Sequence, residues 1–84
     1  MNTQHKAIRA VLTSMSPKRA ISYISAFELP TDEESYLILH DVRGLSYAQI
    51  SEMCHASPET IKRRRQRAYS KIADGIKHSE SREN

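Results

Sequence analysis

Helix-start signals recur along this chain at short intervals, and they limit its fold more than any other feature. Each signal joins a serine or threonine, which can cap a helix, either to a following proline or to Glu or Gln three residues on. The signals are Ser16-Pro17, Thr31 to Glu34, Ser46 to Gln49 and Ser57-Pro58. Because the 84 residues contain only two Gly and three Pro and show little strand-like alternation, they predict an all-α bundle of four to five helices.

Apolar residues at helical spacing indicate the buried side of each predicted helix. We expect helices at about 5–14, from 17 to just before Pro30, at 31–43 with Gly44 ending it, at 46–53, and from 58 onward. The expected core residues are Ile8, Val11, Leu12, Met15, Ala20, Ile21, Ile24, Phe27, Leu37, Ile38, Val42, Tyr47, Ile50, Met53, Ile61, Ala68, Ile72 and Ile76. Cys54 is expected to be a small buried hydrophobe.

Composition excludes several classes of protein. A single cysteine, Cys54, cannot form an internal disulfide, and no apolar run approaches the length of a membrane span. The N-terminus lacks the pattern of a signal peptide, so we expect a cytoplasmic protein without a membrane partner. The four histidines have no metal-ligand spacing with Cys54, and no nucleophile–base pair or phosphate loop is present. We therefore expect no enzymatic activity, metal or cofactor.

Charge is distributed unevenly along the single predicted domain. The chain carries +3 overall, but five of the six charged residues in 31–56 are acidic, and five of the six positions 62–67 are basic. A basic face confined to one element indicates a polyanion partner. We divide the chain into an N-terminal helical extension at 1–30, a helix-turn-helix module at 31–77 and a flexible tail at 78–84. The extension is expected to complete the core or to form an oligomer surface.

The last two predicted helices have the pattern of a helix-turn-helix, a short helix joined by a tight turn to a longer one. Ser51 is small where the two helices must cross, and Ile50 and Ile61 can lock them together. His55 occupies the turn position that favours a positive φ. Basic residues radiate from the second helix, which is the one expected to enter the major groove of DNA.

The segment "LPTDEESYLILHDVRGLSYAQISEMCHASPETIKRRRQRAYSKI" resembles region 4 of sigma-70-type transcription initiation factors, most closely the extracytoplasmic-function branch. The resemblance covers about residues 20–72 without a gap. It is carried by Leu29-Pro30, Asp32 to Glu34, Asp41 to Tyr47, Ile50, Glu52, Ser57-Pro58, Thr60 to Lys62, Arg64, Arg67-Ala68 and Ile72. The helix-turn-helix of response-regulator-type activators is also similar, but it fits less well after Lys62. The chain has no room for region 2, so a stand-alone region 4-like domain is expected.

The resemblance implies binding to the upstream promoter hexamer and to the flap of the RNA polymerase β subunit, or pairing with a separate region 2 subunit. It assigns base reading to Glu59 and Arg63, and Gln66 lies on the same exposed side. Glutamate can accept from cytosine N4, and arginine can donate to guanine O6 and N7. The residues expected on the DNA backbone are Ser57, Thr60, Lys62, Arg64, Arg67 and Lys71.

Arg65 departs from the pattern because it stands on the apolar stripe, four residues after Ile61. We expect it to pair with an acid, either Asp41 or Glu34, or else to mark a groove that a partner fills. Its charge also argues against a membrane-surface helix, which needs an uninterrupted apolar face. The alternatives that stay open are a protein-interaction module that binds RNA polymerase or a sigma factor with little DNA contact, and nonspecific nucleic-acid binding.

Overall fold

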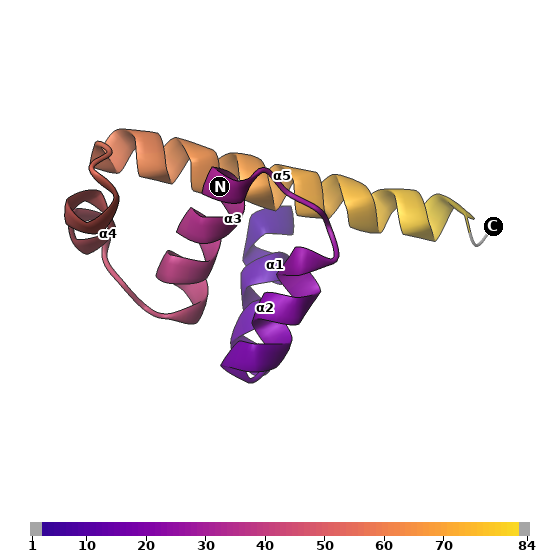
Figure 1. The fold of residues 1–84 in the computed structure, drawn as a ribbon. Helices are drawn as coiled ribbons and strands as arrows, with labels where there is room; N and C mark the ends of the chain where they lie inside the picture. Colours follow the sequence, from indigo (N-terminus) through magenta and orange to yellow (C-terminus); the bar gives the residue numbers. More distant parts are fainter. Residues whose placement is uncertain (1–2, 83–84) are drawn as a thin grey trace.

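The regular structure of the chain is helical throughout the part described in the computed structural model, which covers residues 3–82 and gives side chains for residues 6–77. The elements are α1 (Thr3–Ser14), α2 (Pro17–Ser25), α3 (Thr31–Leu37), the π-helical turn η1 (Ile38–Val42), α4 (Tyr47–Cys54) and α5 (Pro58–Arg82) (Figure 1). The predicted all-α fold is confirmed. α5 continues past the expected module boundary at residue 77, and the flexible tail expected at 78–84 stays a prediction whose side chains lie outside the described residues.

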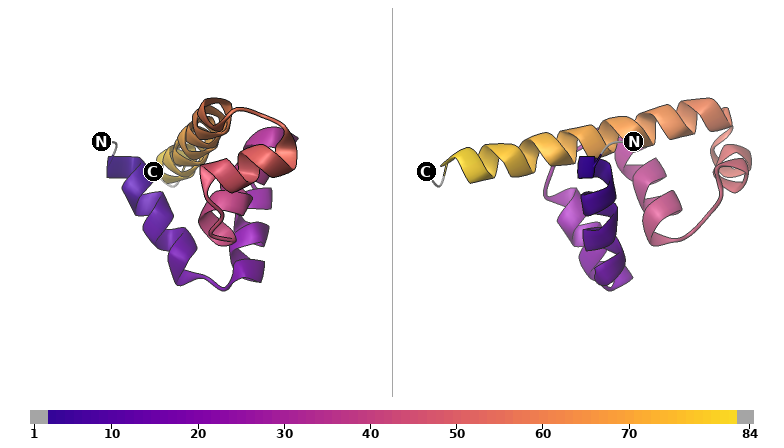
Figure 2. Two further views of the ribbon diagram at one scale, coloured as in Figure 1. Left: turned by 90° about the vertical axis from the view of Figure 1, so that its left-hand side faces the viewer. Right: turned by 180° about the vertical axis from the view of Figure 1, so that it is seen from behind.

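The long helix α5 is the element against which most of the other helices pack. It runs along one edge of the molecule, α4 crosses near its first turns, and α1, α2 and α3 extend away from one side of it (Figures 1 and 2). α5 contacts α1, α3 and α4 directly, whereas α2 contacts η1. The principal extents of 45 × 24 × 24 Å reflect the length of α5. This arrangement leaves the side of α5 opposite α1–α3 uncovered.

Three of the four predicted helix-start signals form as expected. The Ser16 hydroxyl accepts the N–H of Arg19 at 3.4 Å. Ser46 and Gln49 form a reciprocal capping box, in which the Ser46 hydroxyl accepts the Gln49 N–H at 3.1 Å and Gln49 Oε1 accepts the Ser46 N–H at 2.9 Å. Ser57 caps α5 and is described with the site below. These caps define where α2, α4 and α5 begin.

The capping box predicted at Thr31 and Glu34 is wrong. The carbonyl of Pro30 accepts the N–H of Glu34 at 3.0 Å, so Pro30 is the cap residue and Thr31 is already helical. Proline has no side-chain acceptor, and the Asp32 carboxylate accepts the N–H of Glu33 at 2.8 Å instead. The acids of this first turn remain well placed for the helix dipole.

The helix predicted over 31–43 changes its winding before it ends. From Ile38 onward the backbone hydrogen bonds join residues five positions apart instead of four. The N–H of Arg43 donates to the carbonyl of Ile38 at 3.0 Å, which is the π-helical pattern. Gly44 follows with φ 73°, the left-handed conformation expected of it. The π-helical turn was not predicted, because no residue type in this stretch is specific to it.

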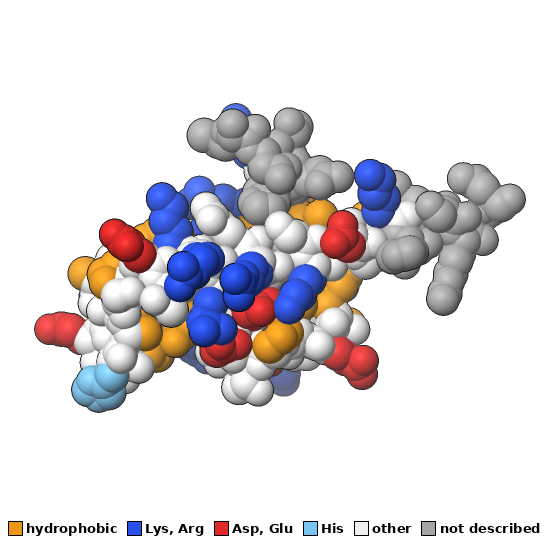
Figure 3. All heavy atoms as spheres, turned by 90° about the horizontal axis from the view of Figure 1, so that it is seen from above, with side chains coloured by type: hydrophobic (Ala, Val, Ile, Leu, Met, Phe, Trp, Pro, Cys, Tyr) orange, Lys and Arg blue, Asp and Glu red, His pale blue; other side chains and the backbone are white. Residues whose placement is uncertain are grey.

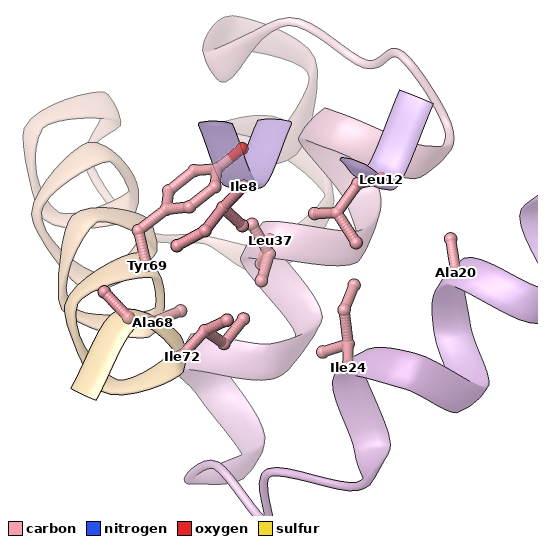
Figure 4. Close-up of a cluster of buried hydrophobic side chains, with 9 residues drawn as sticks. Ile8, Leu12, Ala20, Ile24, Leu37, Ala68, Tyr69 and Ile72 are labelled. Atoms are coloured by element: carbon pink, nitrogen blue, oxygen red, sulfur yellow. The ribbon is translucent and has the colours of Figure 1, made fainter. Parts of the chain in front are cut away.

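A single cluster of buried side chains joins α5 to the three helices beside it (Figure 4). Four of its members come from α1 and α2, one from α3 and four from α5. The cluster consists of Ile8, Leu12, Ala20, Ile24, Leu37, Ala68, Tyr69, Ile72 and Ala73. Partly buried hydrophobic residues pack around it, namely Met15, Tyr23, Phe27, Leu29, Ile38, Val42 and Ile76. The N-terminal helices therefore pack on the same core as α5.

Three residues expected in the core lie at the surface. Val11 is 41% exposed, Met53 is 59% exposed, and Cys54 is exposed as well. α1 buries only the narrow side that carries Ile8 and Leu12, and α4 is so short that only one of its residues is buried. No helix in the described part of the chain combines the length and apolar character needed to cross a membrane.

Candidate nucleic-acid interface

The turn between α4 and α5 has the geometry of a helix-turn-helix. His55 ends α4 with φ 54° and ψ 40°, the left-handed conformation expected at this position. The Ser51 hydroxyl donates to the carbonyl of Ala56 at 2.5 Å, which ties the turn to the helix before it. Ile50 and Ile61 are both fully buried, one on each helix, where α4 and α5 contact each other. The turn thus holds the first residues of α5 in a fixed direction relative to α4.

The outer side of α5 carries a row of polar side chains that we call the recognition face. It consists of Glu59, Lys62, Arg63, Gln66 and Arg67, all exposed. With 3.6 residues per turn, these positions lie away from the buried stripe of Ile61, Ala68 and Ile72. Figure 3 looks down on α5 and shows Lys and Arg side chains gathered there, with Asp and Glu side chains beside them. Among the side chains described for residues 6–77, none forms an ion pair with these five.

The first turn of α5 contains a small hydroxyl pair. The Ser57 hydroxyl accepts the N–H of Thr60 at 3.2 Å and donates to the Thr60 hydroxyl at 2.8 Å. The proton of the Thr60 hydroxyl is therefore available to an acceptor outside the protein. The N–H of Glu59 is available as well, whereas Pro58 has no N–H and the N–H groups of Thr60 and Ile61 bond to Ser57. A phosphate placed at this helix end would also meet the positive end of the helix dipole.

Two of the basic residues expected on DNA phosphates are paired with acids of α3. Arg64 Nη1 donates to Asp32 Oδ2 at 2.6 Å, and both side chains are partly exposed. Lys71 Nζ donates to Glu33 Oε2 at 3.0 Å and lies 2.9 Å from Oε1 of this buried carboxylate. Neither pair was predicted from the sequence. The acid-rich start of α3 was the available signal, but it was interpreted only as capping.

Arg65 is held inside the protein by Asp41, one of the two acids expected for it, and the pairing is confirmed. Arg65 Nε lies 2.5 Å from Asp41 Oδ2, and Nη2 lies 2.8 Å from Oδ1, so the contact is bidentate. Nη1 also donates to the hydroxyl of Tyr47 at 3.0 Å and Nη2 to that of Tyr69 at 3.3 Å. The guanidinium carbon lies 4.7 Å from the centroid of the Tyr69 ring. Arg65 therefore does not belong to the recognition face.

The electrostatics around Arg65 and Tyr69 hold each of these two side chains in one protonation state. Burial acts to lower the pKa of Arg65, but the hydrogen bond and charge of Asp41 outweigh burial and raise that pKa above its usual value. Burial raises the pKa of Tyr69, and the Asp41 carboxylate raises it further. Arg65 is thus always a cation and Tyr69 a neutral hydrogen-bonding group at physiological pH.

The π-helical turn η1 joins this cluster through His40. Its Nδ1 donates to the carbonyl of Leu45 at 2.8 Å, and its ring stacks on Tyr47 with centroids 4.3 Å apart and planes 9° from parallel. Tyr47 in turn accepts from Arg65, so η1, α4 and α5 are linked by polar side chains. The inward position of Tyr47 was predicted, but its hydrogen bond and the contacts of His40 were not.

Comparison with known proteins places this geometry in a family. A family model described as sigma-70, region 4, matches residues 28–72, which is more than half of the chain. The matched span contains α3, η1, α4 and the part of α5 that carries the recognition face. No curated protein and no solved structure matched the chain. Domains of this family bind DNA and RNA polymerase in transcription and are not enzymes. The chain therefore belongs to the sigma-70 region 4 family.

Proposed function

We propose that this protein binds double-stranded DNA sequence-specifically and regulates transcription, with α5 as the recognition helix in the major groove. The observation that carries the proposal is the mixed chemistry of the recognition face, where Glu59, Arg63 and Gln66 are exposed on one side. A carboxylate accepts from cytosine N4, a guanidinium donates to guanine O6 and N7, and an amide pairs with adenine. A helix that bound polyanions by charge alone would gain nothing from Glu59.

The phosphate contacts are proposed to lie on both sides of the base-reading row. Lys62 flanks it on one side and Arg67 on the other, and neither forms an ion pair among the described side chains. Arg64 and Lys71 are each paired with a carboxylate of α3, so either one can contact a phosphate only by sharing or breaking its ion pair. We therefore expect Lys62 and Arg67 to contribute more to DNA affinity than those two. The hydroxyls of Ser57 and Thr60 at the start of α5 complete the set.

RNA polymerase is the proposed protein partner, at promoters of bacterial or phage type. Membership of the region 4 family supports this, since its domains bind both DNA and RNA polymerase. Two mechanisms fit: recruitment through the flap of the polymerase β subunit, or supply of region 4 to a separate region 2 subunit. Both leave the recognition face of α5 on DNA.

The direct test selects bound duplexes from a random pool, with and without RNA polymerase, and then compares single variants. Arg63→Ala should lose about 1–3 kcal/mol on the selected duplex and relax the preference at one base pair. Lys62→Ala should weaken binding to all duplexes alike, since phosphates carry no sequence information. The matched control is Arg43→Ala, which removes an equal charge from an exposed position after η1. It should bind the selected duplex with nearly the same preference.

Two results would contradict the proposal. A selection that yields no preferred sequence, together with an affinity that falls steeply as salt is raised, would indicate nonspecific nucleic-acid binding. Unchanged promoter binding and regulation after charge reversal of both Lys62 and Arg63 excludes base reading by α5. The second result would favour the protein-interaction module, in which the fold binds RNA polymerase or a sigma factor with little DNA contact.

A further inference from the structure

A hollow of about 500 Å³ opens to solvent where α1 ends and α2 begins. It is lined by Met15, Lys18, Arg19, Ser22 and Tyr23. Met15 and Tyr23 pack against the core and form its apolar floor, while Lys18 and Arg19 are exposed at its rim. The hollow combines an apolar surface with two cations.

The two cations stand where the helix itself disfavours them. α2 begins at Pro17 after the Ser16 cap, so Lys18 and Arg19 occupy its first turn, at the positive end of the helix dipole. This turn contains no acid, whereas the first turn of α3 contains three. Neither cation has an ion pair among residues 6–77. Residues that break a local structural preference, here the preference of a helix N-terminus for negative charge, are typical of functional positions. A bound anion would offset the unfavourable interaction between the two cations and the helix dipole.

The hollow lies far from the proposed DNA-binding face. Figures 1 and 2 place the turn between α1 and α2 at the end of the molecule remote from α5, in all three views. A duplex along the recognition face would therefore leave the hollow accessible. The hollow also lies outside residues 28–72, so the family match assigns nothing to it.

We propose that this hollow docks an acidic segment of a protein partner. An aromatic or aliphatic side chain of the segment fills the space between Met15 and Tyr23, and its carboxylates pair with Lys18 and Arg19. The apolar floor favours a protein over a nucleic acid, because a phosphate backbone brings no apolar side chain to cover it. Charge complementarity at the rim sets the orientation and the rate of association. The proposal stands whether or not α5 binds DNA.

The first test titrates the ¹⁵N-labelled full chain with a short, end-blocked peptide made of Asp and Glu around one Phe-Leu pair. Amide shifts should change at residues 14–23 and stay constant in the first turns of α5. Two control peptides separate the contributions, one with Asn and Gln in place of the acids and one with Ser in place of the Phe-Leu pair. Each control should bind at least about tenfold more weakly, since each lacks one half of the recognition.

The second test reverses charge at the rim with Lys18→Glu/Arg19→Glu. Acids are favoured in the first turn of a helix, so this variant should unfold in urea no earlier than the wild type, and lost binding cannot reflect lost folding. The matched control is Lys6→Glu/Arg9→Glu, which makes the same charge change at exposed positions of α1. We expect at least about tenfold weaker peptide binding for the rim variant and less than about twofold for the control.

Several outcomes would overturn the proposal. Equal weakening in both charge-reversed variants would mean that only net charge matters. Shift changes centred on residues 62–67 would place the peptide on the recognition face instead. Absence of binding at millimolar peptide would exclude an acidic segment of this kind. Equal shift changes at residues 14–23 on addition of a scrambled duplex would assign the rim to phosphates.

Discussion

Replacing Arg65 tests whether the buried ion pair holds the helix-turn-helix together. Arg65→Leu leaves the Asp41 carboxylate, whose side chain is only 2% exposed, without its cation. Leaving a buried charge uncompensated costs about 3–5 kcal/mol. In a domain of this size each kcal/mol shifts the melting temperature by about 4–8 °C, so the variant should lose roughly 12–40 °C. The loss is a large part of the total stability of about 5–15 kcal/mol that is typical of proteins. A loss of this size would leave a large fraction of the variant unfolded at physiological temperature, because the buried Asp41 carboxylate has lost its cation.

The double variant Arg65→Leu/Asp41→Leu isolates the interaction. It replaces both charges with apolar side chains, so no buried charge remains and the net charge stays at +3. We expect its stability to lie within about 1–2 kcal/mol of the wild type, since the hydroxyls of Tyr47 and Tyr69 then lose a donor. Unfolding of the wild type, both single variants and the double variant in urea, followed by circular dichroism, completes a double-mutant cycle. Because each single variant leaves one buried charge uncompensated, at about 3–5 kcal/mol, and the double variant leaves none, the coupling energy should be about 4 kcal/mol or more.

DNA binding supplies an independent readout of the same variants. Because Arg65 is turned inward, the folded double variant should bind the selected duplex within about twofold of the wild type. A coupling energy below about 0.5 kcal/mol, or an Arg65→Leu protein as stable as the wild type, would show that the ion pair does not stabilise the fold. The pair would then add nothing to the fold, and the inward position of Arg65 would need another cause.

Three further predictions concern α5 and its neighbours. Asp32→Asn frees Arg64, so DNA should bind more tightly and the slope of log affinity against log salt should steepen by about 0.9. Gly75→Ala would place a Cβ 2.8 Å from the Phe27 ring, and urea unfolding should show a net loss of about 1–2 kcal/mol despite the better helix propensity of alanine. Cys54 is exposed, so it should react with a thiol reagent in the native state while circular dichroism stays unchanged.

Sequence reasoning worked best where structure depends on neighbouring residues. The Ser46 capping box and the positive φ of His55 were predicted because a few adjacent residues determine them. The buried positions of Ile61, Ala68 and Ile72 followed from helical spacing. Thr31 shows the limit of such patterns: its spacing to Glu34 is right, yet Pro30 supplies the first helical carbonyl and the helix begins one residue too early for the box.

Contacts between distant residues were mostly beyond prediction. Arg64 and Asp32 are 32 positions apart, and Lys71 and Glu33 are 38 apart, so no local pattern joins them. Their pairing depends on how α3 packs along α5, which the sequence alone does not specify. Arg65 was the exception, because a charge on an apolar stripe must have a partner when it is buried. A broken pattern was therefore more informative here than a satisfied one.

The pairing of basic residues changes how the charge of α5 should act on DNA. Of the five basic residues at 62–67, Arg64 and Arg65 already have carboxylate partners, and only Lys62, Arg63 and Arg67 stand free among the described side chains. Nonspecific affinity grows with the number of phosphates neutralised, so each internal ion pair lowers binding to random DNA. The proposed base contacts would not be weakened in the same way, since Glu59, Arg63 and Gln66 remain exposed. If α5 reads bases as proposed, the acids at the start of α3 and in η1 favour discrimination between sequences over total affinity, although the composition of α5 alone suggests the opposite.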